Sequence, residues 1–505
     1  MVIACVVALA FRLPGVFNGL PYVSNADEPV IYSIAHRMVA NGTALPHSYT
    51  YPSLHFELNA LVHAAVSTVG RWFGAWHSVN ELGLLPPRPG AAVVLNSEPW
   101  AAARLITVAI AVIGVALVVA LTTRLSGSRR WGLVAGLLAA TSGIGVATGF
   151  VVAPDALAAT TATAAIVAAL RLHGRGAIVA DRRWAILTGA MLGLAVGSKY
   201  NNGLLVLLVI AAVAMAPPER RPTLRHLAIL VLAAGALFLV TTPGALFQPS
   251  EFLSALRGIG GHYSSGHPGY EGDSFSVNAH WLWSSDRLAL VLAVAATSLR
   301  RTRAVALLAG WVVVYFTFVS LPTVHFPRNL SPVLGAVAVL GALGGQQLWH
   351  LLRASRSPTQ RQLMIAVALV ALVPAAWLHA CDRLREFSYN LTDHQGDARR
   401  WLTTQLPAGS AVLTDNYTPW LDEQRYTLTI SGLIAQASPS QAEAFADQYD
   451  AVVFTSDGSG RFTADRERYP AQSAIVDQMR SDACDLVRYE DTAGFWIEVY
   501  FQRCP

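Results

Sequence analysis

Two adjacent carboxylates follow the first apolar segment of this 505-residue chain. Asp27 and Glu28 come soon after an apolar run over residues 1–17. Carboxylates so close to lipid are costly unless they serve a purpose, and a carboxylate held beside a hydroxyl can act as a general base. The simpler interpretation is that Asp27 caps a helix beginning at Pro29.

Further polar residues stand at the ends of other apolar segments. Asp155 opens one segment, Lys199 closes another, and His325 and Arg328 precede a third. If these ends share one membrane surface, they combine carboxylates for base chemistry with cations for a phosphate group. The alternatives are a helix N-cap for Asp155, a side chain reaching the interface for Lys199 and an interfacial anchor for Arg328. Arg104, near the start of another apolar segment, is equally ambiguous.

The composition indicates a polytopic membrane protein. The chain is 53% hydrophobic and 13% charged, whereas soluble domains carry about 25% charged residues. Several apolar runs approach the roughly 20 residues that cross a bilayer as a helix. We therefore predict a mainly α membrane bundle with eleven spans, over residues 1–17, 100–122, 131–150, 156–172, 184–199, 202–216, 224–247, 286–299, 303–320, 328–351 and 361–380.

Arginines gather in alternate short loops, which predicts the orientation. A net charge of +5 does not indicate nucleic-acid binding, because these residues form no single patch. Loops rich in Arg or Lys lie on the cytoplasmic side. The remaining connections, 18–99 and 248–285, would then be outside, together with the tail over 382–505. We expect two helical stretches of the first connection, 29–40 and 53–76, to lie along the membrane surface.

The tail has the pattern of a small α/β domain, separate from a membrane domain over 1–381. Strands are predicted at 411–414 and 451–455, and helices ending near 406 and over 441–448. Cys484 and Cys504 flank a predicted hairpin and could form a disulfide, which would indicate an oxidising compartment. No Cys or His cluster predicts a metal site, although adjacent carboxylates could bind a divalent cation.

The long connection contains a short stretch rich in glycine over residues 266–272. It includes His267, Tyr270 and Glu271. Long loops are often functional, so this stretch is either a lid over a site or a flexible linker.

Several short motifs follow one another in a specific order. They are Arg12-Leu13, Asn25-Ala-Asp-Glu-Pro29, Tyr51-Pro52-Ser53-Leu54, Ala153-Pro154-Asp155, Gly197-Ser-Lys199-Tyr200, Gly266-His-Pro-Gly-Tyr-Glu-Gly272 and His325-Phe-Pro-Arg328-Asn-Leu330. This order resembles the GT-C glycosyltransferases, in particular the branch of protein O-mannosyltransferases and the lipid A aminoarabinose transferase.

The resemblance implies a plasma-membrane enzyme that transfers a sugar, with inversion, from a polyprenyl-phosphate donor to an acceptor hydroxyl at the outer face. It implies Asp27 as catalytic base with Glu28 as its partner. Asp155 would shape the acceptor or phosphate site, and Lys199 and Arg328 would hold the donor phosphate. Weaker candidates for these tasks are Arg104, His325 and Tyr51, the last standing where some relatives have a basic residue.

Two other function classes stay open. A transporter or flippase of polyprenyl lipids usually has charges in the middle of the membrane on broken helices, whereas the charges noted above cluster at one surface. A non-catalytic protein could bind envelope polymers through its tail. Neither the sugar nor the acceptor, whether protein, lipid or glycan, follows from the sequence.

Overall fold

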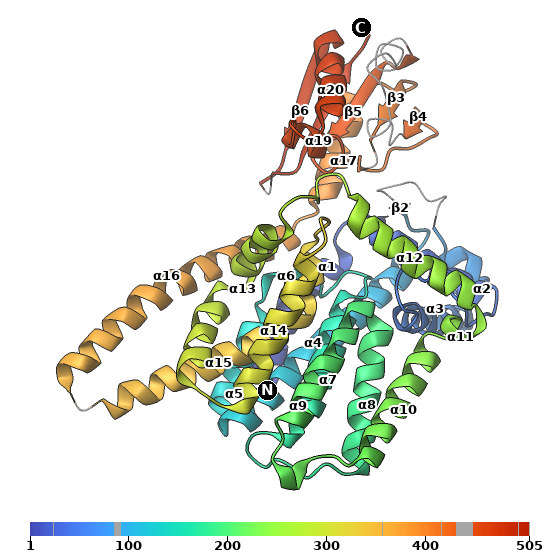
Figure 1. Ribbon diagram of the computed structural model, residues 1–505. Coiled ribbons are helices and arrows are strands. Elements are labelled where there is room, and N and C mark those ends of the chain that lie inside the picture. Colours follow the sequence, from blue (N-terminus) through green and yellow to red (C-terminus); the bar gives the residue numbers. More distant parts are fainter. Residues whose placement is uncertain are drawn as a thin grey trace.

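A computed structural model describes residues 1–23, 25–84, 92–355, 357–415, 417–430, 448–492 and 494–503. It shows a helical bundle with a small sheet region formed by the C-terminal tail (Figure 1). Within these residues, seven helices are long and apolar enough to cross a membrane. This is therefore a multi-pass membrane protein, and the predicted fold class is confirmed. The seven are Ser97–Ser126 (α4), Asp155–Leu172 (α7 and a 3₁₀ turn), Leu224–Thr241 (α10), Ser274–Leu299 (α13), Arg303–Ser320 (α14), Pro327–Ala354 (a 3₁₀ turn and α15) and Pro358–Asn390 (α16).

The other four predicted spans are shorter helices, so eleven crossings stay a prediction. They are α1 (Val2–Phe17), α5 (Arg129–Ala140), α8 (Arg182–Ser198) and α9 (Leu205–Ala214). The span expected over 131–150 breaks after Ala140, and a short helix α6 (Gly143–Ala147) follows. The break occurs where the Ser142 hydroxyl accepts a hydrogen bond from the backbone N–H of Gly145 and caps the new helix.

Helix α13 begins at Ser274, twelve residues earlier than predicted. The Asp273 side chain accepts hydrogen bonds from the backbone N–H groups of Phe275 and Ser276, at 3.1 and 3.3 Å, and so starts the helix. The position where we expected the helix to begin, Asp286, has non-helical backbone angles and kinks it instead.

Small residues let the helices approach closely. Gly189 and Gly193 of α8 face α10, and a Cβ at these positions would lie 2.2 Å from Leu230 O and 2.5 Å from Ala234 O. Such contacts between backbones are typical of helix pairs in membranes, where van der Waals packing holds helices together.

The first connection contains two helices where the sequence predicts them, α2 (Asp27–Ala40) and α3 (Leu54–Trp72). At the end of α3, Trp72 and Phe73 are exposed, as suits residues at a membrane interface. A helix that we did not predict, α12 (Pro249–Ser265), crosses the bundle beneath the tail (Figure 1).

The tail follows α16, which continues through the boundary expected at residue 381. After α17 (His394–Gln405) comes a five-stranded sheet in the order β4-β3-β5-β7-β6. Strands β3, β4 and β5 are parallel, and β6 and β7 form the predicted antiparallel hairpin. The strands are β3 (Ala411–Thr414), β4 (Thr427–Ile430), β5 (Ala451–Thr455), β6 (Asp485–Glu490) and β7 (Trp496–Phe501).

Two predictions for the tail concern residues outside the described part of the chain. Cys484 is disulfide-bonded, while Cys504, its predicted partner, lies outside the described residues. The same holds for residues 441–447 of the helix predicted over 441–448.

Candidate active site

Asp27 is the first residue of α2, and its carboxylate does not cap the helix. The Asn25 side chain does so, because its Oδ1 accepts hydrogen bonds from the N–H groups of Asp27 (3.0 Å) and Glu28 (3.3 Å). The capping interpretation of Asp27 is therefore wrong. Its Oδ2 lies 2.8 Å from Nη1 of Arg328, and both side chains are about a third exposed.

Arg328 lies in the 3₁₀ turn Pro327–Leu330 that leads into α15. Its guanidinium stacks 4.6 Å above the Phe326 ring, which limits its orientation. Its partner Asp27 comes from a distant part of the sequence, so the ion pair joins the first connection to the start of α15.

Asp155 and Lys199 form a second ion pair, with 2.7 Å between Oδ1 and Nζ. Asp155 begins α7 without capping it, and Lys199 directly follows α8. Both are buried, so Lys199 does not extend to the interface. Its Nζ also donates to Oδ1 of Asn329 at 3.1 Å. Because Asn329 is the neighbour of Arg328, the two ion pairs are held close together.

Glu28 and Arg104 form a third ion pair, which is buried. Arg104 donates to both carboxylate oxygens of Glu28, at 2.7 and 3.0 Å, and to the carbonyl of Asn18 after α1. Glu28 also accepts from the N–H of Val152 at 2.7 Å and is fully buried. This pair fixes the start of α2 against α1 and the segment before α7. We infer that both are positioning residues.

Two cavities meet at the Asp27–Arg328 pair. The first, of about 400 Å³, extends toward α16, and we name it the Arg383 cavity. The second, of about 690 Å³, we name the Lys199 cavity. Five residues line both cavities, namely Asn25, Asp27, Tyr270, Phe326 and Arg328.

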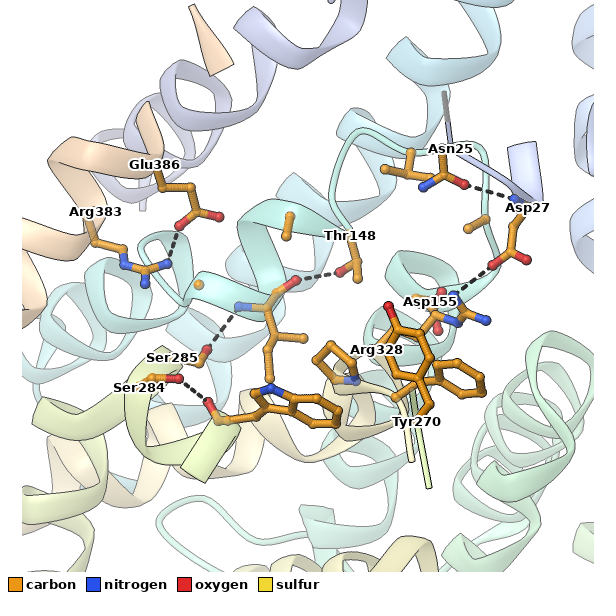
Figure 2. A pocket seen from close by; sticks show the side chains of 18 residues that line it. Asn25, Asp27, Thr148, Asp155, Tyr270, Ser284, Ser285, Arg328, Arg383 and Glu386 are labelled. Atoms are coloured by element: carbon orange, nitrogen blue, oxygen red, sulfur yellow. Dashed lines mark hydrogen bonds and ion pairs between the residues drawn. The ribbon is translucent and has the colours of Figure 1, made fainter. Parts of the chain in front are cut away.

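Each end of the Arg383 cavity carries an ion pair. Figure 2 shows Asp27 and Arg328 at one end and Arg383, paired with Glu386, at the other. Asp155 lines this cavity as well. The Lys199 cavity is lined by Lys199 and Tyr51, and by Ala255, Leu256 and Ile259 of α12. The structure thus brings together Asp27, Asp155, Lys199 and Arg328 as the sequence predicts.

Glu28, Arg104 and His325 line neither cavity. His325 is buried beside Trp281, and its Nδ1 lies 3.1 Å from the Ser274 hydroxyl. Of the predicted residues, these three and Glu271 therefore face neither cavity.

The stretch over 266–272 forms part of the cavity wall. Backbone hydrogen bonds run from His325 N to Tyr270 O at 2.9 Å and from Gly272 N to Thr323 O at 3.1 Å. His267 lines the Lys199 cavity, and burial and nearby Arg461 lower its pKa to about 4. Glu271 instead pairs with Arg468 of the tail at 3.8 Å.

Tyr51, another residue singled out in the sequence, lines the Lys199 cavity. Burial and the nearby carboxylate of Asp27 raise the pKa of its phenol. Tyr51 therefore stays protonated and offers a neutral hydrogen-bond donor.

The adjacent carboxylates do not converge on a common ligand. Glu28 is directed to Arg104, whereas Asp27 is directed to Arg328. Within the described residues, no three His, Cys, Asp or Glu side chains are grouped to hold a metal ion.

Sequence reasoning missed several residues that line the cavities. Arg383 and Glu386 lie on α16 beyond the span that we predicted, because the helix continues past its apolar part. Tyr417, Asp457 and Arg461 come from the tail and line the Lys199 cavity. No motif signals them, since they face the site only through the packing of the tail.

Part of the sequence and most of the fold are similar to known proteins. Residues 91–245 match the family model described as dolichyl-phosphate-mannose-protein mannosyltransferase. The crystal structure of ArnT from Cupriavidus metallidurans, bound to undecaprenyl phosphate, superposes with a TM-score of 0.52 and 16% identity over 99% of this chain and 97% of that chain. By fold, the chain is similar to membrane glycosyltransferases of the GT-C superfamily.

A second GT-C structure is similar over nearly the whole chain. It is the archaeal oligosaccharyltransferase AglB from Archaeoglobus fulgidus, in complex with an inhibitory peptide and a dolichol-phosphate, with a TM-score of 0.51 and 13% identity over 98% of this chain and 73% of that chain. No curated protein sequence gives a significant match.

Proposed function

We propose that this GT-C protein transfers a sugar from a polyprenyl-phosphate donor to an acceptor hydroxyl at the outer face of the plasma membrane. The observation that carries the proposal is the Asp27–Arg328 pair at the junction of two cavities. One residue is suited to take a proton and the other to bind a phosphate. In support, the structure of ArnT holds undecaprenyl phosphate, and that of AglB holds a dolichol-phosphate.

We assign the donor to the Lys199 cavity. Lys199 and Arg328 supply positive charge for the phosphate, and Ala255, Leu256 and Ile259 of α12 offer an apolar surface to the prenyl chain. The acceptor then approaches through the Arg383 cavity and reaches Asp27 from the opposite side.

The reaction is a direct displacement. Asp27 takes the proton of the acceptor hydroxyl, and the oxygen forms a bond to the anomeric carbon. The bond from that carbon to the phosphate oxygen breaks, and the polyprenyl phosphate leaves with the electron pair. Arg328 and Lys199 stabilise the charge that develops on the phosphate. Attack from the side opposite the leaving group inverts the anomeric configuration.

Two observations support an outward orientation. Arg residues gather in every second short loop along the chain. Loops of this kind lie on the cytoplasmic side, so the remaining connections would lie outside. The disulfide-bonded Cys484 suits an oxidising compartment for the tail. The tail lies at the same end of the bundle as the cavities, because Tyr417 and Arg461 line one of them.

The test is a transfer assay with purified full-length protein in lipid vesicles. Radiolabelled polyprenyl-phosphate mannose and polyprenyl-phosphate arabinose are each incubated with an envelope extract, and the labelled product is identified. We expect transfer of at least one sugar and none with the Asp27→Asn variant. Equal labelling with wild type and the Asp27→Asn variant would refute the role of Asp27.

A further inference from the structure

The parallel strands of the tail direct their carboxyl ends toward the Lys199 cavity. β3 and β5 are neighbours and run parallel, with Val412 opposite Ala451. In sheets of this kind, ligands bind outside the carboxyl ends of the strands. Tyr417 follows β3, Asp457 follows β5, and both line the Lys199 cavity.

A buried carboxylate holds these two loops in place. Asp415, directly after β3, accepts hydrogen bonds from the N–H groups of Tyr417 (3.0 Å), Thr455 (2.7 Å) and Ser459 (3.1 Å). These bonds join the loop after β3 to the loop after β5. Residues held by such supporting bonds are preorganised for a ligand.

Arg461 attaches the tail to the wall of the cavity. Its guanidinium lies 4.3 Å from the centre of the Tyr417 ring and 4.9 Å from that of Tyr270. Its aliphatic part packs against Gly269, where φ is +78° and a Cβ would lie 2.8 Å from Arg461 Cβ. Only glycine suits this position, both for its backbone conformation and for the close approach.

Asp457 makes no hydrogen bond among the described residues, and its side chain is accessible from the cavity. Together with Arg461 and Tyr417 it offers an acceptor, a donor and an aromatic ring face. A sugar ring presents hydroxyl groups at its edge and C–H groups on its face, so this combination is suited to it. The volume of about 690 Å³ is within the range of small-molecule sites, about 300–1,000 Å³.

We propose that Tyr417, Asp457 and Arg461 form a subsite for the sugar ring of the donor. The inference rests on the proposed function, in which Lys199 and Arg328 hold the donor phosphate in this same cavity. The sugar is joined directly to that phosphate, so it lies within the same enclosure. The tail thereby contributes to the choice of sugar.

The test measures binding to the full-length protein in nanodiscs. The probes are polyprenyl phosphate, polyprenyl-phosphate mannose and polyprenyl-phosphate arabinose. We expect wild type to bind one sugar-bearing lipid about tenfold more tightly than the bare lipid, as hydrogen bonds to charged groups allow. Asp457→Asn should lose this preference while its affinity for bare polyprenyl phosphate is unchanged. Asp477→Asn, at the exposed tail pair with Arg466, should behave as wild type.

Each other outcome has a distinct meaning. If the wild-type protein binds the bare lipid but shows no preference for sugar, the subsite is refuted and the proposed function stands. If the wild type binds none of the three lipids, both fail. A preference that persists in Asp457→Asn also overturns the subsite. In turnover, Asp457→Asn should raise the KM for the donor alone, and a rise confined to the KM for the acceptor would contradict the proposal.

Discussion

Asp27 and Arg328 lie 2.8 Å apart where the two cavities meet, so each neutralises the other's charge. In the proposed mechanism, a donor phosphate that binds Arg328 would compete with Asp27 for the guanidinium. Donor binding would then release the carboxylate that is proposed to accept the proton, which would couple the arrival of the donor to activation of the base.

This coupling predicts a specific behaviour of the Asp27→Asn variant. Its kcat should fall about 10²–10⁴-fold, the usual contribution of a general base. Its affinity for polyprenyl phosphate should be equal to or higher than that of wild type, because the competing charge is gone. Single-turnover transfer and lipid binding measure the two effects. Glu219→Gln, an exposed carboxylate in another loop, serves as the control, and weakened lipid binding by Asp27→Asn would oppose the coupling.

Lys199→Ala should destabilise the protein strongly. The substitution leaves the buried carboxylate of Asp155 without its cation, and breaking a buried pair in this way costs about 3–5 kcal/mol. Thermal unfolding in detergent should show a clear loss. Arg466→Ala removes a cation from the exposed pair with Asp477 and should change the unfolding temperature little, because water screens an exposed pair. Equal effects of the two substitutions would argue against a buried pair at Asp155.

Glu28→Gln separates the positioning role from the catalytic one. Because Glu28 is fully buried and paired with Arg104, its substitution should lower the unfolding temperature and reduce activity only in proportion to the loss of folded protein. The pH profile of the remaining activity should match wild type. A stable variant with altered pH dependence would instead assign Glu28 to the chemistry.

His267 predicts a pH dependence of stability. Burial, and then Arg461, His262 and Arg328, lower its pKa to about 4, whereas the unfolded chain has a His pKa near 6.5. The unfolded state therefore binds the proton first as the pH falls. The contribution of His267 is present above about pH 6.5 and declines toward about pH 4. Unfolding temperatures at pH 7 and pH 5 should differ less for His267→Gln than for wild type, and an equal difference would disprove the shift.

Much of the fold was predictable because long apolar runs specify helices. The positions where helices start or break within these runs were not predictable, since they depend on local capping side chains. Ser142 starts α6 and Asp273 starts α13, and neither changes the hydropathy of its segment. Helix α12 was missed because its sequence is rich in glycine and weakly apolar.

The site was predictable to the extent that its residues stand at helix ends. Asp27, Asp155, Lys199 and Arg328 all stand at the ends of apolar segments, which the sequence reveals, and two ion pairs bring them together. The sequence does not reveal the direction in which each side chain points. Glu28 and Arg104, which turn away toward α1, were therefore indistinguishable from the residues that line the cavities. Nor does it reveal that Asp457 and Arg461 of the tail reach the same cavity.

The most direct test of the central claim is a structure of the Asp27→Asn variant bound to the polyprenyl-phosphate sugar that wild type transfers. We expect the phosphate within hydrogen-bond distance of Lys199 and Arg328, and the anomeric carbon facing the side chain at position 27. A lipid phosphate bound at Arg383 or outside both cavities, with the anomeric carbon far from position 27, would contradict the account.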